Sequence, residues 1–306
     1  MTRRRAMNVT VTGATGLIGA RLVGALRDRG DDVIVLSRRP EAARDGLGVE
    51  ARLWDPMAGP PPADAIAGRD AVIHLAGENV AQRWSPQAKR GIRESREIGT
   101  RHLVAGIGGA DPRPSALVSA SAVGYYGPRG SEVVDETAAP GDDFLAQVCV
   151  AWEREAVAAT ALGVRVVCLR TGVVLDRHGG ALAKMLPFFR AGVGGPVAGG
   201  AQYMPWVHAQ DLCRMYRAAL DGEDWEGPIN STAPEPVTNR EFAKRLGRAL
   251  GRPAVAPVPG FAVRLLYGDM AEIVTEGQRA VPARPLALGY PFTHPDLDEA
   301  LADALR

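Results

Sequence analysis

The stretch Val9-Thr10-Val11-Thr12-Gly13-Ala14-Thr15-Gly16-Leu17-Ile18-Gly19 decides the fold of this chain. Its β-branched run predicts a strand, its three glycines predict a tight turn, and the apolar residues that follow at helical spacing predict a helix. In such a unit the first glycine permits the turn, the second lets backbone approach a pyrophosphate, and the third lets the helix pack on the strand. The phosphates then meet free N–H groups at the helix N-terminus. The alternative is a plain glycine turn; we favour a dinucleotide site formed by Gly13, Thr15, Gly16, Leu17, Ile18 and Gly19.

The composition is that of an ordinary globular protein. The chain has 306 residues, 46% of them hydrophobic and 23% charged, with a net charge of +1. This balance argues against a nucleic-acid or membrane-surface role, and no apolar run is long enough to cross a bilayer. Cys149, Cys168 and Cys213 show neither paired nor metal-like spacing, so we expect reduced thiols and no metal. The basic opening, residues 1–6, lacks the apolar core of a secretory signal, and we expect a cytoplasmic protein.

The residues after the second expected strand, 32–36, indicate which dinucleotide is bound. An acidic residue at this position would accept hydrogen bonds from the adenosine ribose of NAD, whereas arginine would pair with the 2′-phosphate of NADP. The chain has Ser37, Arg38 and Arg39 there and no acid. The alternative is that both arginines are solvated turn charges. The pattern favours NADP(H).

Further candidate cofactor residues follow the next two expected strands. Asp55 ends a short third strand, where two roles are open: contact with the adenine amino group, or the start of a turn. Residues 70–77 predict a buried strand with a small-residue exit, and ligands of open α/β sheets bind at that end. In the long helix expected over 86–107, Arg96 lies on the stripe that faces the sheet, so it either pairs inside or reaches the cofactor.

Alternating strands and helices continue through the expected strand 164–170 and predict a doubly wound parallel sheet of the α/β class. We expect a Rossmann domain over 7–172, completed by a returning segment at about 204–232. Residues 173–203 and 233–306 are then expected to form a smaller substrate-side lobe.

The chain resembles the extended, atypical short-chain dehydrogenase/reductases of the NAD-dependent epimerase/dehydratase type. Within them it is similar to a subgroup labelled sugar-nucleotide epimerase or cell-division inhibitor, which has its own C-terminal domain. The matching motifs span the whole chain: residues 12–19, 74–79, 119–127, 152–153, 169–175, 206–208 with Asp211, and 277–279. The resemblance implies an NADP-binding Rossmann domain with cofactor-lining residues at Ser37, Arg38, Leu75, Ala76, Arg96 and near Val173; Gly77 belongs to the same exit. It also makes a homodimer through the helices flanking the sheet an expectation.

The chain departs from the superfamily at its catalytic pair. The resemblance implies a serine plus Tyr-x-x-x-Lys, in which the phenol is the acid/base and the ammonium lowers its pKa. Aligned on Ser121, the tyrosine would fall near 144–146 and the lysine near 148–149, but this segment has neither. Tyr125 and Tyr126 follow Ser121, and we take these three as the candidate catalytic residues, with Arg96 or Arg170 supplying positive charge.

Three functions therefore stay open. The first is an NADP(H)-dependent oxidoreductase or epimerase with relocated acid/base residues, acting on an unidentified small carbonyl or sugar-like substrate. The second is a non-catalytic NADP(H)-dependent sensor or regulator of division or stress. The third is catalysis without hydride transfer, by a dehydratase or isomerase.

Overall fold

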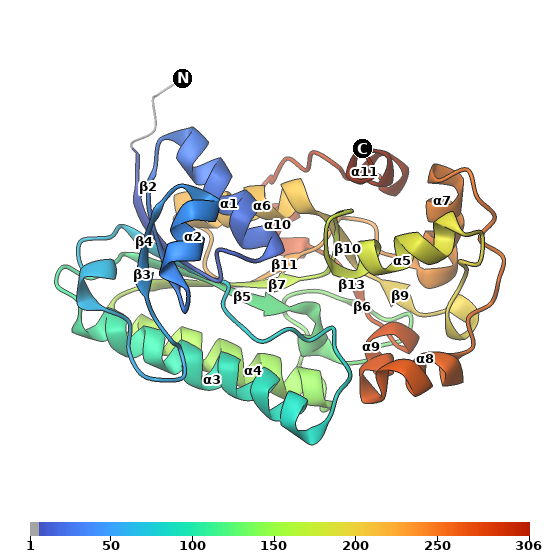
Figure 1. Ribbon diagram of the computed structural model, residues 1–306, viewed down its shortest axis with the longest axis horizontal. Coiled ribbons are helices and arrows are strands. Elements are labelled where there is room, and N and C mark those ends of the chain that lie inside the picture. Colours follow the sequence, from blue (N-terminus) through green and yellow to red (C-terminus); the bar gives the residue numbers. More distant parts are fainter. Residues whose placement is uncertain (1–5) are drawn as a thin grey trace.

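The computed structural model describes residues 6–306, so residues 1–5 of the basic opening lie outside the described part. A seven-stranded, fully parallel sheet forms its centre, in the order β11-β7-β5-β4-β1-β2-β3 (Figure 1). Its strands are β1 Asn8–Thr12, β2 Asp32–Ser37, β3 Glu50–Leu53, β4 Ala71–His74, β5 Ala116–Ala122, β7 Arg165–Thr171 and β11 Gly227–Ser231. The expected doubly wound α/β fold is confirmed.

Helices cover both faces of this sheet (Figure 1). One face carries α1 Leu17–Arg29, α2 Pro40–Leu47 and α6 Ala209–Asp221. The other carries α3 Pro86–Gly109 and α4 Phe144–Val157, which pack on each other. Because the central strands are buried on both sides, most of their residues are apolar, and two separate clusters of buried side chains fill the two interfaces.

The remaining elements lie mostly at one end of the sheet (Figure 1). A third apolar cluster packs α5 Gly180–Arg190, α7 Asn239–Ala249 and α11 Leu297–Ala304 together. The other helices are α8 Gly260–Tyr267, α9 Glu272–Thr275, α10 Ala283–Ala287 and the 3₁₀ turns η1 Ala63–Ala65, η2 Val123–Tyr126, η3 Ala158–Leu162, η4 Ala198–Gly200 and η5 Asp269–Ala271. Short paired strands are β6 Val133–Val134, β8 Val173–Leu175, β9 Tyr203–Met204, β10 Trp206–His208, β12 Val237–Thr238 and β13 Arg279–Ala280.

The returning segment supplies β11, which pairs with β7 at the edge of the sheet. The intervening residues 173–203 contribute α5 to the third apolar cluster. The proposed boundary between a Rossmann domain and a substrate lobe stays a prediction. Within residues 6–306, no helix is both long and apolar enough to span a membrane.

Two elements differ from their expected lengths. β4 ends at His74 rather than continuing to residue 77, because the backbone N–H groups of Leu75 and Ala76 both donate to the Thr12 hydroxyl. The sequence of residues 144–162 predicts one continuous helix, but the structure is α-helical only from Phe144 to Val157 and finishes as the 3₁₀ turn η3. Such tightening of a last turn is common at helix ends.

Candidate cofactor and active site

The glycine turn between β1 and α1 is held by close backbone contacts. Gly13 has a φ of +66°, and a Cβ there would lie 2.6 Å from the carbonyl carbon of Leu75. A Cβ on Gly19 would overlap the carbonyl oxygen of Gly13. Gly16 is the exposed N-cap residue of α1. Because glycine has no side chain that could accept from the first backbone N–H groups of the helix, these groups stay available for an anion. The geometry therefore fits a pyrophosphate cradle.

A buried polar relay fixes the turn against β4. The Thr12 hydroxyl oxygen accepts the N–H groups of Leu75 and Ala76, each at 3.2 Å, and lies 2.7 Å from His74 Nδ1. With both lone pairs used, the hydroxyl donates its proton to Nδ1, so Nε2 carries the imidazole proton toward the Thr100 hydroxyl at 3.0 Å. Burial lowers the pKa of His74 to about 3. The ring is therefore neutral and acts as a structural link.

The exit of β4 meets Arg96 of α3. Its guanidinium donates to the carbonyls of Glu78 and Ile92 and lies over the Trp152 ring, 4.9 Å from the centroid. A Cβ on Gly77 would come 3.1 Å from its central carbon. Burial lowers the pKa of Arg96, and although the Glu78 carboxylate acts on it through space, Arg96 makes no ion pair within residues 6–306. Leu75 and Ala76 are half-buried at the same exit, and Gly77 is exposed.

The turn after β2 leaves two cations free. The Ser37 hydroxyl accepts the backbone N–H of Arg39 at 3.0 Å. Both Arg38 and Arg39 are exposed, and neither guanidinium makes an ion pair with any other described residue. Asp55 is exposed and accepts the N–H of Met57, which fits its turn role; the adenine role stays a prediction.

The loop after β8 reaches the N-terminus of α1. Val173 begins β8 and is half-buried. A few residues on, a Cβ at Gly179 would lie 3.0 Å from the Leu17 side chain, so this loop packs directly beside the glycine turn. Thr15 lies in the turn and is exposed, whereas Ile18 lies in the first turn of α1 and is half-buried. The predicted cofactor residues of the turn, the β4 exit and Arg96 thus lie together.

The candidate catalytic residues sit at the carboxyl ends of β5 and β7. Ser121 on β5 stands beside Arg170 on β7, which stands beside Asn230 on β11. Ser121 is buried, and its hydroxyl donates to the Glu153 carboxylate of α4 at 2.6 Å. The same carboxylate accepts two hydrogen bonds from Arg170, both 2.8 Å. Such a bidentate pair fixes the plane of the guanidinium.

Tyr126 belongs to this buried network. Its hydroxyl donates to Asn230 Oδ1 at 2.7 Å and accepts from Arg170 at 3.0 Å. The side chain is fully buried, and burial raises its pKa to about 12. Glu136 extends the network by accepting the backbone N–H of Asn230 at 2.9 Å. The structure places Tyr126 as a satisfied internal group; its catalytic role stays a prediction.

Tyr125 is placed differently. It is half-buried, and the guanidinium carbon of Arg170 lies 3.4 Å from its ring centroid. Within the described chain its hydroxyl makes no hydrogen bond to protein. The guanidinium stacked on the ring face holds the ring of Tyr125 in place. Of the two tyrosines, Tyr125 has the hydroxyl that is free to meet a ligand.

The positions of the missing tyrosine and lysine are filled by apolar packing. Ala146, Val148 and Cys149 are buried on α4. Burial raises the pKa of the Cys149 thiol to about 12, so it is a neutral core group.

Sequence reasoning missed Glu153, Asn230 and Glu136 as site residues. Glu153 belongs to the matching motif at 152–153, and its spacing of nine residues from Phe144 places it on the helix that begins there, α4. Asn230 lies in a short segment whose pairing with β7 was not expected in detail. The parallel register brings Ser121, Arg170 and Asn230 into one row on one face, a relationship that no local pattern contains.

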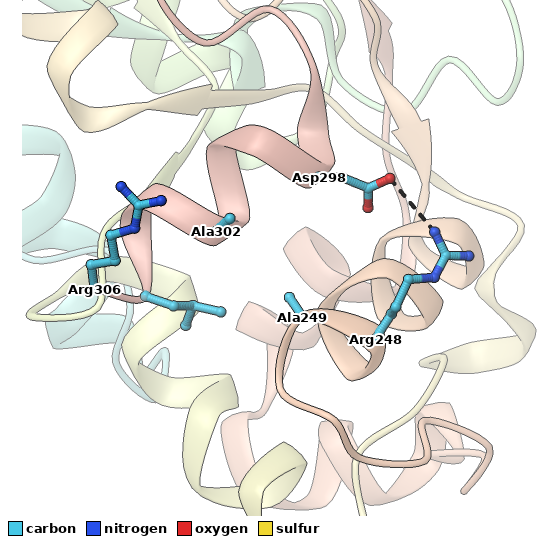
Figure 2. Close-up of a pocket in the computed structure, with 6 residues that line it drawn as sticks. Arg248, Ala249, Asp298, Ala302 and Arg306 are labelled. Atoms are coloured by element: carbon cyan, nitrogen blue, oxygen red, sulfur yellow. Dashed lines mark ion pairs between the residues drawn. The ribbon is translucent and has the colours of Figure 1, made fainter.

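Two further features lie apart from these groups. His208, His294 and Asp303 cluster closely enough to hold a metal ion. However, His208 Nδ1 accepts the backbone N–H of Gln210 and caps α6, so its neutral ring carries the proton on Nε2 toward Asp303. Figure 2 shows a pocket of about 400 Å³ between α7 and α11, whose lining includes the ion pair Arg248–Asp298 and no predicted site residue.

Comparison with known proteins places the chain in a family. Residues 9–230 match the NAD dependent epimerase/dehydratase family. The chain belongs to this family. Residues 258–304 match a domain of unknown function, DUF1731, which makes this an atypical short-chain dehydrogenase/reductase with its own C-terminal domain.

Individual relatives support the membership. An epimerase family protein SDR39U1 homolog, chloroplastic, from Arabidopsis thaliana is 42% identical, over 96% of this chain and 86% of the relative. The crystal structure of human epimerase family protein SDR39U1 (isoform 2) with NADPH is 37% identical, with a TM-score of 0.87, covering 98% of this chain and 100% of that one. A nucleoside-diphosphate sugar epimerase structure from Corynebacterium glutamicum is 34% identical with a TM-score of 0.79, covering 98% of this chain and 58% of that one.

Proposed function

We propose that this epimerase-family protein binds NADP(H) and is an oxidoreductase or epimerase acting on a small carbonyl or sugar-like substrate. The observation that carries the cofactor choice is the pair of unpaired, exposed cations Arg38 and Arg39 after β2. A 2′-phosphate would supply the anion that these guanidinium groups lack within the described chain. The human relative crystallised with NADPH supports the same choice.

The residues of the glycine turn fit this cofactor. The close contacts at Gly13 and Gly19 and the uncapped start of α1 suit a pyrophosphate. Arg96 would lie beside the cofactor at the exit of β4, as a cation without an ion pair in residues 6–306. When bound, a nicotinamide supplies or accepts hydride.

In the proposed chemistry, Tyr125 exchanges a proton with the substrate oxygen. Its hydroxyl is free of protein partners in the described structure, and Arg170 holds positive charge against its ring. Glu153 fixes Arg170 and accepts the hydrogen bond of the Ser121 hydroxyl, so Ser121 offers a ligand its lone pairs rather than its O–H. Glu153 and Arg170 are therefore positioning residues, and Tyr125 is the acid/base.

A titration of NADPH and NADH by fluorescence tests the cofactor proposal. We expect NADPH to bind more tightly, and Arg38→Ala to weaken NADPH at least about tenfold while leaving NADH unchanged, because only NADPH carries the 2′-phosphate. Arg248→Ala, in the pocket between α7 and α11, is the matched control and should change neither affinity. Equal affinities in the wild-type protein would contradict the proposal.

One observation favours the second candidate, a non-catalytic NADP(H)-dependent regulator. The positions that hold the superfamily's catalytic pair are buried and apolar on α4. The two candidates differ in turnover. If the protein is an enzyme, screening carbonyl compounds for NADPH oxidation should find a substrate. Tyr125→Phe should then lower the turnover of that substrate and leave the affinity for NADPH unchanged. A partner retained only in the presence of NADPH, without turnover, would instead support the regulator.

A further inference from the structure

Arg279, on the short strand β13, has a cationic head without a protein partner. Within residues 6–306, its guanidinium makes no hydrogen bond and no ion pair, and its Nε is enclosed without an acceptor. Two other enclosed arginines have such partners: Arg170 pairs with Glu153, and Arg165 donates to the carbonyls of Ala219 and Leu220 in α6 and of Trp225 just after it. Arg217 shares the unpartnered Nε of Arg279, but no aromatic ring contact is found for Arg217 in the described chain. An enclosed donor on a cation is costly unless an acceptor meets it. The missing acceptor is therefore expected from outside the chain.

Within the described residues, this head group stacks on an aromatic ring. The guanidinium carbon of Arg279 lies 5.0 Å from the ring centroid of Tyr203, on β9. The two segments are tied together, because a Cβ at Gly277 would overlap the Tyr203 carbonyl oxygen and Gln202 donates to the carbonyl of Val274 at 2.7 Å. Arg279 thus stands on a fixed support and is held by its ring contact rather than by an anion.

The same segment is attached to the turn that carries Tyr125. The backbone N–H of Arg129 donates to the Gly277 carbonyl, and its Nε donates to the Tyr126 carbonyl, both at 3.0 Å. Ala280, the next residue, packs in one apolar cluster with Tyr125 and Tyr126. Because successive side chains of a strand point to opposite sides, Arg279 projects away from that cluster, toward Tyr203.

We infer that Arg279, stacked on Tyr203, binds an oxyanion group of the substrate. The planar guanidinium fork matches either a carboxylate or a phosphoryl group, and the ring holds the fork in place while its N–H groups stay free. The inference rests on the proposed function, since it places an anion-binding arginine on the segment that is hydrogen-bonded to the Tyr125 turn, and it therefore expects the substrate to be an anionic carbonyl or sugar-like compound. Arg279 supplies affinity and orientation there, without taking part in proton transfer.

Anion binding to the NADPH-loaded protein tests the inference. Inorganic phosphate and malonate are titrated by calorimetry at constant ionic strength. We expect the wild-type protein to bind one of them, and Arg279→Gln to raise that dissociation constant at least about tenfold. Binding of phosphate but not malonate would show that the site takes a phosphoryl group, and binding of malonate but not phosphate would show that it takes a carboxylate. Arg248→Gln removes one positive charge from the pocket between α7 and α11, where Arg248 pairs with Asp298, and should leave binding unchanged (Figure 2).

Two outcomes would overturn the inference: no binding of either anion by the wild-type protein, or equal binding by Arg279→Gln. Tyr203→Leu is a second variant in case Arg279→Gln does not fold, and it should weaken the same anion several-fold by removing the stacking surface. NADPH affinity is measured in every variant and should not change. If the wild-type protein did not bind NADPH at all, the proposed function would be contradicted instead. Failure of the inference and failure of the proposed function can therefore be told apart.

Discussion

The Ser121 hydroxyl donates its single proton to the Glu153 carboxylate at 2.6 Å, from the end of β5 to the middle of α4. A serine hydroxyl without such a partner could donate its hydrogen bond to a substrate oxygen. Here the proton is already used, and the carboxylate that accepts it also holds Arg170. Ser121, Glu153 and Arg170 therefore form one supporting unit beneath Tyr125.

Glu153→Gln should destabilise the fold by about 3–5 kcal/mol, because it leaves the buried Arg170 cation without its counter-charge. Urea unfolding of both proteins measures the difference. Glu241→Gln is the matched control, since it removes an exposed carboxylate paired with Arg245 within α7 and should cost under about 1 kcal/mol. Equal losses of stability in Glu153→Gln and Glu241→Gln would contradict the stabilising role of the buried Glu153–Arg170 pair.

Loss of the hydroxyl should lower the stability of the protein at Tyr126 but leave it nearly unchanged at Tyr125. Tyr126→Phe leaves Asn230 and Arg170 each short of a buried partner and should lower the free energy of unfolding by about 1–3 kcal/mol. Tyr125→Phe removes a hydroxyl without a protein partner and should stay within about 0.5 kcal/mol of the wild type. Thermal and urea unfolding give both values; a larger loss in Tyr125→Phe would reverse the assignment.

Two glycines of α1 form a matched pair for testing the cradle. Gly19→Ala should weaken NADPH binding and destabilise the protein, because its Cβ would overlap the Gly13 carbonyl and push the turn open. At Gly24, a Cβ meets nothing within 4 Å, so Gly24→Ala should keep NADPH affinity and add about 0.5–1 kcal/mol of stability. Fluorescence titration and urea unfolding compare the two, and indistinguishable variants would refute the packing argument.

The stability of the protein should fall in acid through His74. Its folded pKa of about 3 lies below the unfolded value of 6.5, so the unfolded chain binds the extra proton between these limits. Stability is then fully present above about pH 6.5 and declines by up to about 1.4 kcal/mol per pH unit below it. His74→Gln, less stable at pH 8, should show a shallower slope from pH 6.5 to 4.5. A slope equal to that of the wild type would contradict the assignment of the acid sensitivity to His74.

Much of the fold was predictable because its signals are local. The alternation of strands and helices, the glycine turn and the basic residues after β2 each lie within short windows of sequence. The same holds for the small residues that follow β4. These features depend on spacing along one element, which the sequence states directly.

The candidate active site was less predictable because it depends on contacts between distant segments. Whether Tyr125 or Tyr126 is free depends on Asn230, over a hundred residues away along the chain. Likewise, the partner of Ser121 lies 32 residues on, and only the packing of α4 on β5 selects it. The end of β4 at His74 depends on the Thr12 hydroxyl of another strand. None of these choices is encoded in a neighbouring residue.

The late return of the chain to form β11 has a consequence for engineering. Because residues 173–203 leave the sheet and residues 227–231 come back to its edge, no single cut yields a complete nucleotide-binding half. A fragment ending at residue 172 loses both the edge strand and Asn230, hence the hydrogen bond that orients Tyr126. Swapping the smaller part for that of a relative therefore needs several junctions, and each chimera must keep the β11 row in register.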